Sequence, residues 1–479
     1  MTAHTSPSPR VHAFTDDALA DHDAVSLAAA LRSGELSRRE VTEAAIARIR
    51  AVDPAVHGME LDCFATALAD ADTDLPAGPL AGVPSLIKDN ADVAGMPTRH
   101  GSAAFDPHAR RASSAPARQF LAQGYTLLGK STLPEFGLSA TTEYSDPARE
   151  PTRNPWHTDH SSGASSGGSA ALVAAGAVPI AHANDGGGSI RIPAAACGLV
   201  GLKPTRGRLL DRPGVRQLPV NLVAEGVVSR SVRDTAHHLA GCEAYAPAPE
   251  LPRVGLVEGP SGRRLRIGVV TRDILGRPID PEVERVVRSA ADLYRGLGHE
   301  IVETHLDVDP RFIDDFQLYW GVSSALMTVS ALAEKPRGFH PRRLDGFTIA
   351  LNRLARRRAA AVPGAIRRLR GATAIYDRHF AGIDAMLGPT LAHPAPKIGE
   401  LSPTLPFDAL FDRLVDYVGF TPLNNVGGGP AISLPHGMYS GGLPGSVQLS
   451  AVRGDERLLL DLGYQLEAEA PFPKITDPA

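Results

Sequence analysis

The sequence has few cysteines and no excess of either charge. Only Cys63, Cys197 and Cys242 occur in 479 residues, and three thiols at such wide spacing fit neither a disulfide framework nor a metal knuckle. The 49 lysines and arginines nearly balance the 53 aspartates and glutamates, so the molecule lacks the positive field that holds a polyanion. These absences favour a reducing compartment and argue against nucleic-acid binding.

Long apolar runs are also absent. The longest, residues 170–183, is shorter than the roughly 18 to 20 residues that a membrane span needs. The first 17 residues lack a basic start followed by an apolar stretch, so they do not resemble a secretory signal peptide. We therefore expect a cytoplasmic protein without a transmembrane anchor.

The composition is that of an ordinary globular protein. Hydrophobic residues make up 43% of the chain and charged residues 21%, close to the average for soluble domains. The Ser/Pro-rich start predicts a loose tail over residues 1–22. Because the sequence contains no internal repeat, we expect one large domain over residues 1–479.

Helix and strand patterns alternate along the chain. A capping box beginning at Ser37 predicts an amphipathic helix to Val52. Residues 80–87 and 125–128 are typical of buried strands, with a helix over 111–123 between them. Farther on, strands at 265–270 and 299–304 flank a predicted helix that starts at Asp280-Pro281. This alternation predicts an α/β fold with a parallel or mixed sheet.

Residues 312–380, the helical insertion, follow a different pattern of long helices rich in arginine. Its arginines include Arg353, Arg356, Arg357, Arg358, Arg367, Arg368 and Arg370. One interpretation is a surface that binds a membrane or a protein partner. The interpretation we favour is a solvated helical face that covers an active site.

Two Gly/Ser clusters are candidates for chemistry. Ser189 follows three glycines, so successive backbone N–H groups can converge on an oxyanion without side chains in the way. Ser165 lies in the second cluster, residues 163–167, which leads into a helix predicted to begin at Ser169. Alone, each cluster is also typical of a flexible turn with a solvated serine.

Lys88 directly follows the predicted strand over residues 80–87. A lysine acts as a base at neutral pH only if burial lowers its pKa from the usual value near 10.4. Taken singly, an ion pair with the adjacent Asp89 is the default interpretation of Lys88.

Residues 124–131 match the phosphate-loop pattern, which suggests a nucleotide-hydrolysing protein. The match follows a predicted helix, and its interior is itself typical of a strand, so the context argues against this function. Residues 163–167 fit the nucleophile elbow of α/β-hydrolases, with Ser165 as nucleophile. The segment before them is not typical of a strand, which argues against that alternative.

A short loop suggests a metal site. It contains His157, Asp159 and His160, but ligands this close together match no diagnostic set. We interpret them as surface hydrogen-bonding groups.

Taken together and in order, these segments resemble the amidase signature family over nearly the whole chain. The matching stretches are GVPSLIKDN ending at Asn90, LLGKSTLPEFGLSATTEY from Leu127, NPW from Asn154, the two Gly/Ser clusters, AAACGLVGLKPTRGR ending at Arg208, SRSVRDTAHHLAG from Ser229, LGPT from Leu387, and PAISLPHG followed by GLPGSVQL near the end. The resemblance implies an α/β/α sandwich around a large mixed β-sheet. It also implies a catalytic core over 76–245 and a helical lid insertion over 312–380.

The resemblance implies a catalytic triad of three residues. Ser189 matches the nucleophile, Ser165 the bridging serine associated with an unusual cis peptide, and Lys88 the base. A neutral lysine would take a proton from Ser165, which in turn takes one from Ser189. The family needs neither a metal nor a cofactor.

Further positions match groups that support this triad. The N–H groups of Gly186, Gly187, Gly188 and Ser189 would form the oxyanion hole. Around them, Asp185, Arg191 and Ser166 match supporting positions beside the triad, and a local ion pair is the alternative for the first two.

The sequence departs from the family at two positions. Ala164 stands where the family often has glycine, and Gly187 stands where many members have threonine. Neither change removes a reacting group, but both alter the substrate side of the oxyanion hole. The run of three glycines resembles the branch that contains cyclic-oligoamide and xenobiotic amidases.

For substrate, the resemblance favours small apolar amides, including anilides, and also carbamates, which present the same carbonyl and an amine leaving group. The alternative within the family is the glutaminase subunit of a tRNA-dependent amidotransferase, which acts with a partner. The sequence leaves the oligomeric state open, and a homodimer is among the alternatives.

Overall fold

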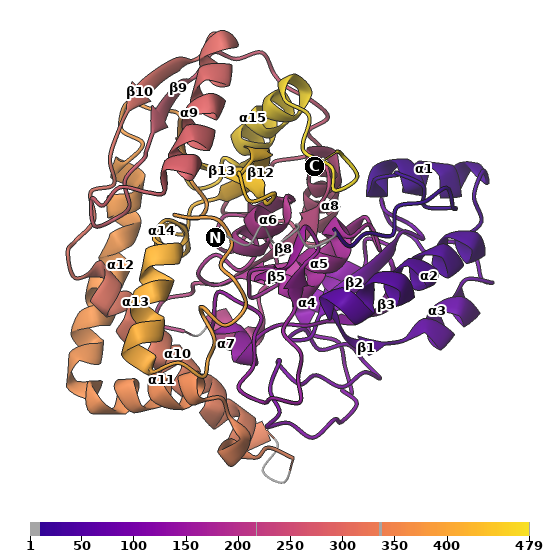
Figure 1. Cartoon of the computed structure of the whole chain (residues 1–479), viewed down its shortest axis with the longest axis horizontal. Helices are drawn as coiled ribbons and strands as arrows, with labels where there is room; N and C mark the ends of the chain where they lie inside the picture. The colour runs from indigo at the N-terminus through magenta and orange to yellow at the C-terminus, as the bar shows by residue number, and fades with distance from the viewer. Residues whose placement is uncertain (1–9, 217, 335–337, 479) are drawn as a thin grey trace, which may run out of the picture.

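The computed structural model describes residues 10–216, 218–334 and 338–478 (Figure 1). The strands are β1 (Met59–Asp62), β2 (Pro84–Lys88), β3 (Thr126–Ser131), β4 (Arg153–Asn154), β5 (His157–Ser161), β6 (Ile180–Asp185), β7 (Val200–Lys203), β8 (Ala224–Ser229), β9 (Arg266–Val269), β10 (Glu300–Glu303), β11 (Ala385–Gly388), β12 (Ala431–Met438) and β13 (Pro444–Ala451). The helices are α1 (Ala24–Ser33), α2 (Arg38–Val56), α3 (Phe64–Asp70), α4 (Ala115–Leu121), α5 (Gly167–Ala174), α6 (Arg191–Cys197), α7 (Pro213–Arg216), α8 (Val232–Tyr245), α9 (Pro281–Gly296), α10 (Phe312–Glu334), α11 (Gly346–Arg357), α12 (Val362–Arg378), α13 (Phe407–Tyr417), α14 (Thr421–Gly427) and α15 (Glu456–Glu469).

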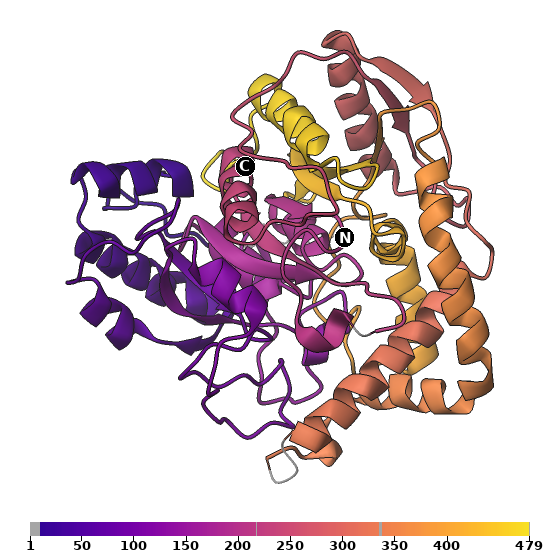
Figure 2. The same cartoon turned by 180° about the vertical axis from the view of Figure 1, so that it is seen from behind.

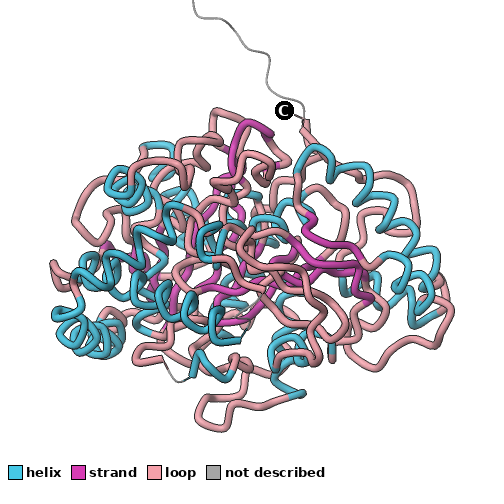
Figure 3. The backbone as a smooth tube through the Cα atoms, turned by 90° about the horizontal axis from the view of Figure 1, so that it is seen from below, coloured by secondary structure: helices cyan, strands magenta, loops and turns pink. Residues whose placement is uncertain are grey.

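A mixed sheet of eight strands forms the centre of the molecule, in the order β10-β9-β11-β13-β12-β7-β8-β6. β9 is parallel to β10 and β11, and the remaining neighbours are antiparallel. Helices α5 and α6 pack together on one side, and α8, α9 and α15 pack together on the other. The strands lie inside a shell of helices and loops (Figure 3). This arrangement confirms the predicted α/β/α sandwich around a large mixed sheet.

A second sheet has three strands in the order β1-β3-β2. Strands β2 and β3 are parallel and are connected through α4, as the alternating pattern predicted. β2 also lies against β6, where the Ser85 hydroxyl donates to the carbonyl of Ile180 at 2.8 Å. The end of β2, which carries Lys88, therefore lies beside the end of the large sheet.

Local sequence signals correctly predicted where two helices begin. Ser37 and Glu40 form the predicted capping box at the start of α2. The side chain of Asp280 caps α9, with Pro281 at its first position. In both cases residues within one turn supply the missing hydrogen bonds of the helix end, so the signal is local.

Two boundaries differ from the sequence-based predictions. The helix predicted to begin at Ser169 begins at Gly167, and the hydroxyl of Ser169 donates to the carbonyl of His182 instead of capping the helix. The helix predicted over 111–123 is limited to Ala115–Leu121.

The loose tail predicted over residues 1–22 is wrong for residues 10–22; the rest lies outside the described residues. This segment packs on the core, where the amides of Val11 and Ala13 donate to the carbonyls of Pro155 and Ala175 at 2.8 Å. Arg48, which is buried, forms an ion pair with Asp17. These contacts outweigh the weak local preference of the Ser/Pro-rich sequence.

The helical insertion forms an outer layer of α10, α11 and α12 along one side of the molecule (Figures 1 and 2). Two of its arginines are used within the layer, since Arg358 pairs with Asp314 and Arg368 with Asp315. Within the described residues, the chain contains no helix with the length and apolar character of a membrane span.

Candidate active site

Lys88 is fully buried and has three polar neighbours. Its Nζ lies 2.7 Å from Ser165 Oγ, 2.9 Å from Ser166 Oγ and 2.8 Å from Asn184 Oδ1. Burial lowers the pKa of Lys88 to about 7, although the Glu225 carboxylate opposes this shift. A neutral amine has two N–H donors and one lone pair, which suits three such contacts. Lys88 can therefore accept a proton from one of the two serines at neutral pH.

The default ion pair between Lys88 and Asp89 is wrong. Asp89 pairs instead with Lys130, at 3.2 Å between Oδ1 and Nζ. Lys130 is the second-to-last residue of the segment that matched the phosphate-loop pattern, and there it is buried in β3 and donates to Thr98 and to the carbonyl of Ala91. This segment is a strand rather than a phosphate-binding loop.

Ser165 lies just before α5, after a cis peptide bond between Ala164 and Ser165. Its hydroxyl contacts a lysine, whereas the nucleophile elbow requires a histidine. Gly137 covers it from the opposite loop, where a Cβ would lie 2.9 Å from Ser165 Oγ. Ser165 is thus enclosed between Lys88 and a glycine that lines the pocket.

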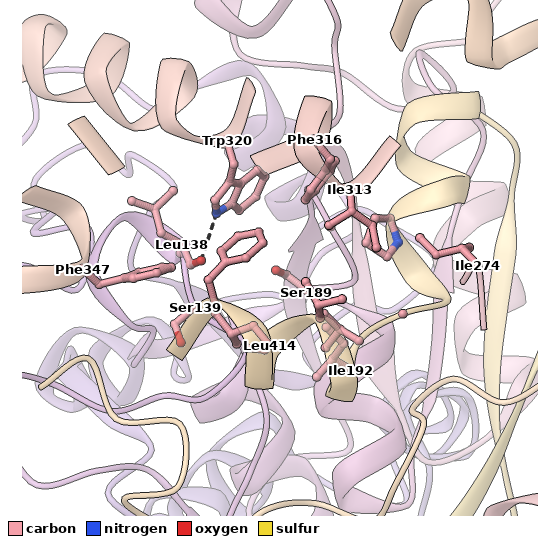
Figure 4. A pocket seen from close by; sticks show the side chains of 18 of the residues that line it. Leu138, Ser139, Ser189, Ile192, Ile274, Ile313, Phe316, Trp320, Phe347 and Leu414 are labelled. Atoms are coloured by element: carbon pink, nitrogen blue, oxygen red, sulfur yellow. Dashed lines mark hydrogen bonds between the residues drawn. The ribbon is translucent and has the colours of Figure 1, made fainter. Parts of the chain in front are cut away.

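Ser189 lies in the turn between β6 and α6, with its side chain on the pocket wall (Figure 4). It is 7% exposed, and its hydroxyl has no hydrogen-bond partner among the described residues. The link between Lys88 and Ser165 is therefore formed, whereas the link from Ser165 to Ser189 is not. Catalytic hydrogen bonds often tighten only when substrate binds.

The glycines before Ser189 do not all have free N–H groups. The N–H of Gly188 donates to Asp185 Oδ1 at 2.7 Å, so the predicted role of Gly188 as an oxyanion donor is wrong for this conformation. The N–H groups of Gly186, Gly187 and Ser189 make no hydrogen bond within the described part of the chain. These three remain candidates for the oxyanion hole.

Asp185 and Arg191 hold the turn that contains Ser189. Arg191 Nε lies 2.9 Å from Asp185 Oδ2, and both side chains are fully buried. Burial acts to raise the pKa of Asp185, but the guanidinium of Arg191 acts in the opposite direction. The resulting pKa is about 2. Arg191 also donates to Asn424 and Asn425 of α14. The turn is therefore fixed to a distant helix through one buried ion pair.

A pocket of about 90 Å³ lies in front of Ser189. It is lined by Gly137, Leu138, Ser139, Ala140, Gly187, Ser189, Ile192, Ile274, Phe312, Ile313, Phe316, Trp320, Phe347, Phe411, Leu414, Val415, Val418, Gly419 and Pro422. None of these lining residues carries an ionisable side chain. The pocket therefore suits an uncharged, apolar group.

Aromatic residues of α10 form one wall of this pocket. Phe312, Phe316 and Trp320 are spaced four residues apart, with ring centroids 6.2 and 5.5 Å apart and ring planes tilted by 19°. The indole N–H of Trp320 donates to the carbonyl of Leu138 at 3.0 Å (Figure 4). A Cβ at Gly187 would lie 3.5 Å from Phe316, so the wall begins directly above Gly187.

Sequence reasoning missed several residues of the site. Asn184 contacts Lys88 and directly precedes Asp185 in β6, so the alternation of strand side chains could have placed it on the opposite face from Asp185. By contrast, Phe316, Trp320 and Asn425 come from elements far along the chain. No local pattern indicates that they meet Ser189.

The structure gives no support to the metal alternative. Among the described residues, no group of three or more His, Cys, Asp or Glu side chains could hold a metal ion. Nδ1 of His160 instead lies 2.7 Å from the carbonyl of Ala395.

The fold and this site define an amidase signature protein, and comparison with known families agrees: the Amidase family model matches residues 40–460, so the chain belongs to that family. It is an amide-hydrolysing enzyme.

Among its relatives, proteins called amidase AmiC from Mycobacterium bovis and Mycobacterium tuberculosis are 48% identical over 474 residues, which cover 98% of this chain and 99% of theirs. The 6-aminohexanoate-cyclic-dimer hydrolase of Paenarthrobacter ureafaciens is 35% identical, over 95% of this chain and 97% of that one.

Solved structures are similar over the same extent. A 6-aminohexanoate cyclic dimer hydrolase in complex with substrate has a TM-score of 0.85 and 32% identity, covering 95% of this chain and 99% of that one. A bacterial aryl acylamidase of the amidase signature family has a TM-score of 0.81 and 25% identity, covering 96% and 99%.

Proposed function

We propose that this enzyme hydrolyses small, uncharged, apolar amides, anilides among them, through Ser189, Ser165 and Lys88. The observation that carries this proposal is the combination of a buried amine, whose pKa burial lowers to about 7, in contact with Ser165 and an apolar pocket in front of Ser189. The names of two relatives, an aryl acylamidase and a cyclic-dimer hydrolase, support the same substrate class.

The proposed reaction begins with a relay of two protons. Lys88 Nζ takes the hydroxyl proton of Ser165, and Ser165 Oγ takes that of Ser189 as Ser189 Oγ attacks the carbonyl carbon. The N–H groups of Gly186, Gly187 and Ser189 receive the negative charge of the tetrahedral oxygen, and each donor typically contributes a few kcal/mol.

The relay then runs in reverse. The protonated Lys88 returns a proton through Ser165 to the leaving nitrogen, the C–N bond breaks, and an acyl group remains on Ser189 Oγ. Water attacks this ester by the same route, so the acid leaves and Ser189 regains its proton. No other reactant is consumed.

The pocket favours uncharged substrates over glutamine. Glutamine carries an ammonium and a carboxylate, and burial of an unpaired charge is costly. None of the residues that line the pocket supplies a counter-charge. An aryl carbamate presents the same carbonyl with an amine leaving group, so we include carbamates in the proposed substrate class. The helical insertion would act as the substrate lid, since α10 and α11 supply part of the pocket wall.

One substrate panel tests the proposal: an anilide, an aryl carbamate, a linear oligoamide and glutamine, each with the wild type and Ser189→Ala. We expect turnover of the anilide by the wild type and its loss in Ser189→Ala. A fluorophosphonate probe should label Ser189; labelling of Ser165 would instead support the elbow mechanism. Turnover of glutamine alone would contradict the proposed substrate class.

We also propose that the enzyme is cytoplasmic. Cys63, Cys197 and Cys242 are free thiols, and the last two are buried. Such thiols are typical of a reducing compartment.

A further inference from the structure

A second buried acid lies on the Lys88 side of the large sheet and is not used by the proposed reaction. Glu225 of β8 pairs directly with Asn184 of β6 in the antiparallel ladder. Cross-strand partners point to the same face of a sheet, and so do residues two apart in one strand. Glu225, Asn184 and His182 therefore share a face, and Asn184 Oδ1 is 2.8 Å from Lys88 Nζ on that face.

The carboxylate of Glu225 is held by few partners. It is 5% exposed, and its Oε2 lies 3.2 Å from Nε2 of the buried His182. Within the described residues this oxygen has no well-directed hydrogen bond. Asp185 is different, because its oxygens accept from Arg191, Asn425 and Gly188. The charge of Glu225 is therefore less neutralised than that of Asp185.

The reaction needs a negative charge at this place. When Lys88 takes the proton from Ser165, a cation forms in a fully buried position, where an unpaired charge is costly. Ser165, Ser166 and Asn184 offer dipoles but no charge. A carboxylate on the same face stabilises the ammonium and costs no reorganisation, because it is already in place.

We propose that Glu225 is a positioning residue that supplies the fixed counter-charge for protonated Lys88. The inference rests on the proposed triad. Glu225 keeps its charge throughout, and no proton passes to it: the proton travels only between Ser189, Ser165, Lys88 and the leaving nitrogen. His182, which lies in the same strand as Asn184, is the side chain 3.2 Å from this carboxylate.

The charges around Lys88 determine whether its pKa rises or falls when the charge of Glu225 is removed. Glu225 and Asp185 raise the pKa of Lys88, and Arg212 lowers it. Burial lowers the pKa of His182, which favours its uncharged form. Removing the charge of Glu225 should therefore lower the pKa of Lys88 further and make the amine a weaker base.

The test is the pH dependence of anilide hydrolysis in Glu225→Gln, normalised to active sites titrated with a fluorophosphonate. We expect the acidic limb of kcat/KM to move to lower pH by about one unit and the maximal kcat to fall about tenfold, since a weaker base takes the proton less readily. Glu225→Asp keeps the charge on a side chain that is shorter by one methylene. Its acidic limb and its maximal kcat should therefore lie between those of the wild type and those of Glu225→Gln. If Glu225→Gln does not fold, the position of the acidic limb of Glu225→Asp tests the inference.

The matched control is Glu243→Gln, which removes a buried carboxylate that pairs with Arg208 away from the pocket. Its acidic limb should remain that of the wild type. An unmoved limb in both Glu225 variants, or an equal shift in Glu243→Gln, would overturn the inference. Failure of the triad itself is seen separately, as retained activity in Lys88→Ala.

Discussion

In the proposed mechanism, the protonation state of Lys88 sets the pH range of the reaction. The amine is a base only when it is uncharged, and burial places its pKa at about 7. Below that pH the ammonium form predominates and cannot take the proton of Ser165. Burial favours the neutral form of this lysine, and Ser165, Ser166 and Asn184 supply its polar contacts without an ion pair.

We therefore expect kcat/KM for an uncharged anilide to fall on acidification through about pH 7, by about tenfold per unit at lower pH. The measurement is a pH profile between pH 5 and 9, with circular dichroism at each pH to show that the fold persists. Lys88→Ala should be inactive at every pH. A flat profile from pH 5 to 8 would exclude Lys88 as the base.

A glycine is required at position 188 both by the backbone conformation there and by the atoms that surround it. Its φ is +135°, and a Cβ would lie 2.4 Å from Thr421 Oγ1. Gly188→Ala should displace the turn that carries Ser189 and reduce kcat/KM by about 10²-fold, as small misplacements of a nucleophile do. Gly187→Ala is the matched control, because its Cβ would meet Phe316 at an ordinary 3.5 Å. Equal activity of the two variants would contradict this account.

At the scale of elements, local signals and long-range contacts differ in how well the sequence predicts them. The starts of α2 and α9 could be predicted because the capping residues lie within one turn of each helix end. The triad positions came from the motifs of the family. The pocket wall could not be predicted, because α10 is apolar on most sides and its periodicity does not show which face meets Ser189.

The aromatic wall of α10 gives the prediction at this scale. Phe316→Ala removes a ring that lies above Gly187 and lines the pocket, so KM for an anilide should rise about tenfold, the size expected when roughly one aromatic contact is lost. Leu326→Ala on the same helix is the control, since Leu326 is 43% exposed and does not line the pocket. Steady-state kinetics with a cyclohexyl amide of similar size should show a smaller rise. Unchanged KM values in Phe316→Ala would remove α10 from substrate binding.

At the scale of the whole molecule, the order of the strands brings together residues that are distant in the sequence. Strands β6 and β13 belong to one sheet although more than half of the chain separates them. Sequence periodicity can indicate that a segment is a strand, but it carries no information on which strands are neighbours. For this reason the contact between Asn184 and Glu225, and the packing of residues 10–22, became visible only in the structure.

Arg208 joins such distant parts of the chain. It is fully buried, and it pairs with Glu243 of α8 and Glu456 of α15 at 3.1 and 2.8 Å. Arg208→Ala leaves two buried carboxylates without their cation, which typically destabilises a fold by about 3 to 5 kcal/mol. We expect a clear fall in the thermal midpoint, measured by calorimetry, while kcat per active site remains unchanged because Arg208 does not line the pocket.

The control is Arg288→Ala, whose partners Glu284 and Glu303 are exposed; such pairs contribute only about 0 to 1 kcal/mol. Equal midpoints for the two variants would show that this buried network does not hold the C-terminal helix on the core.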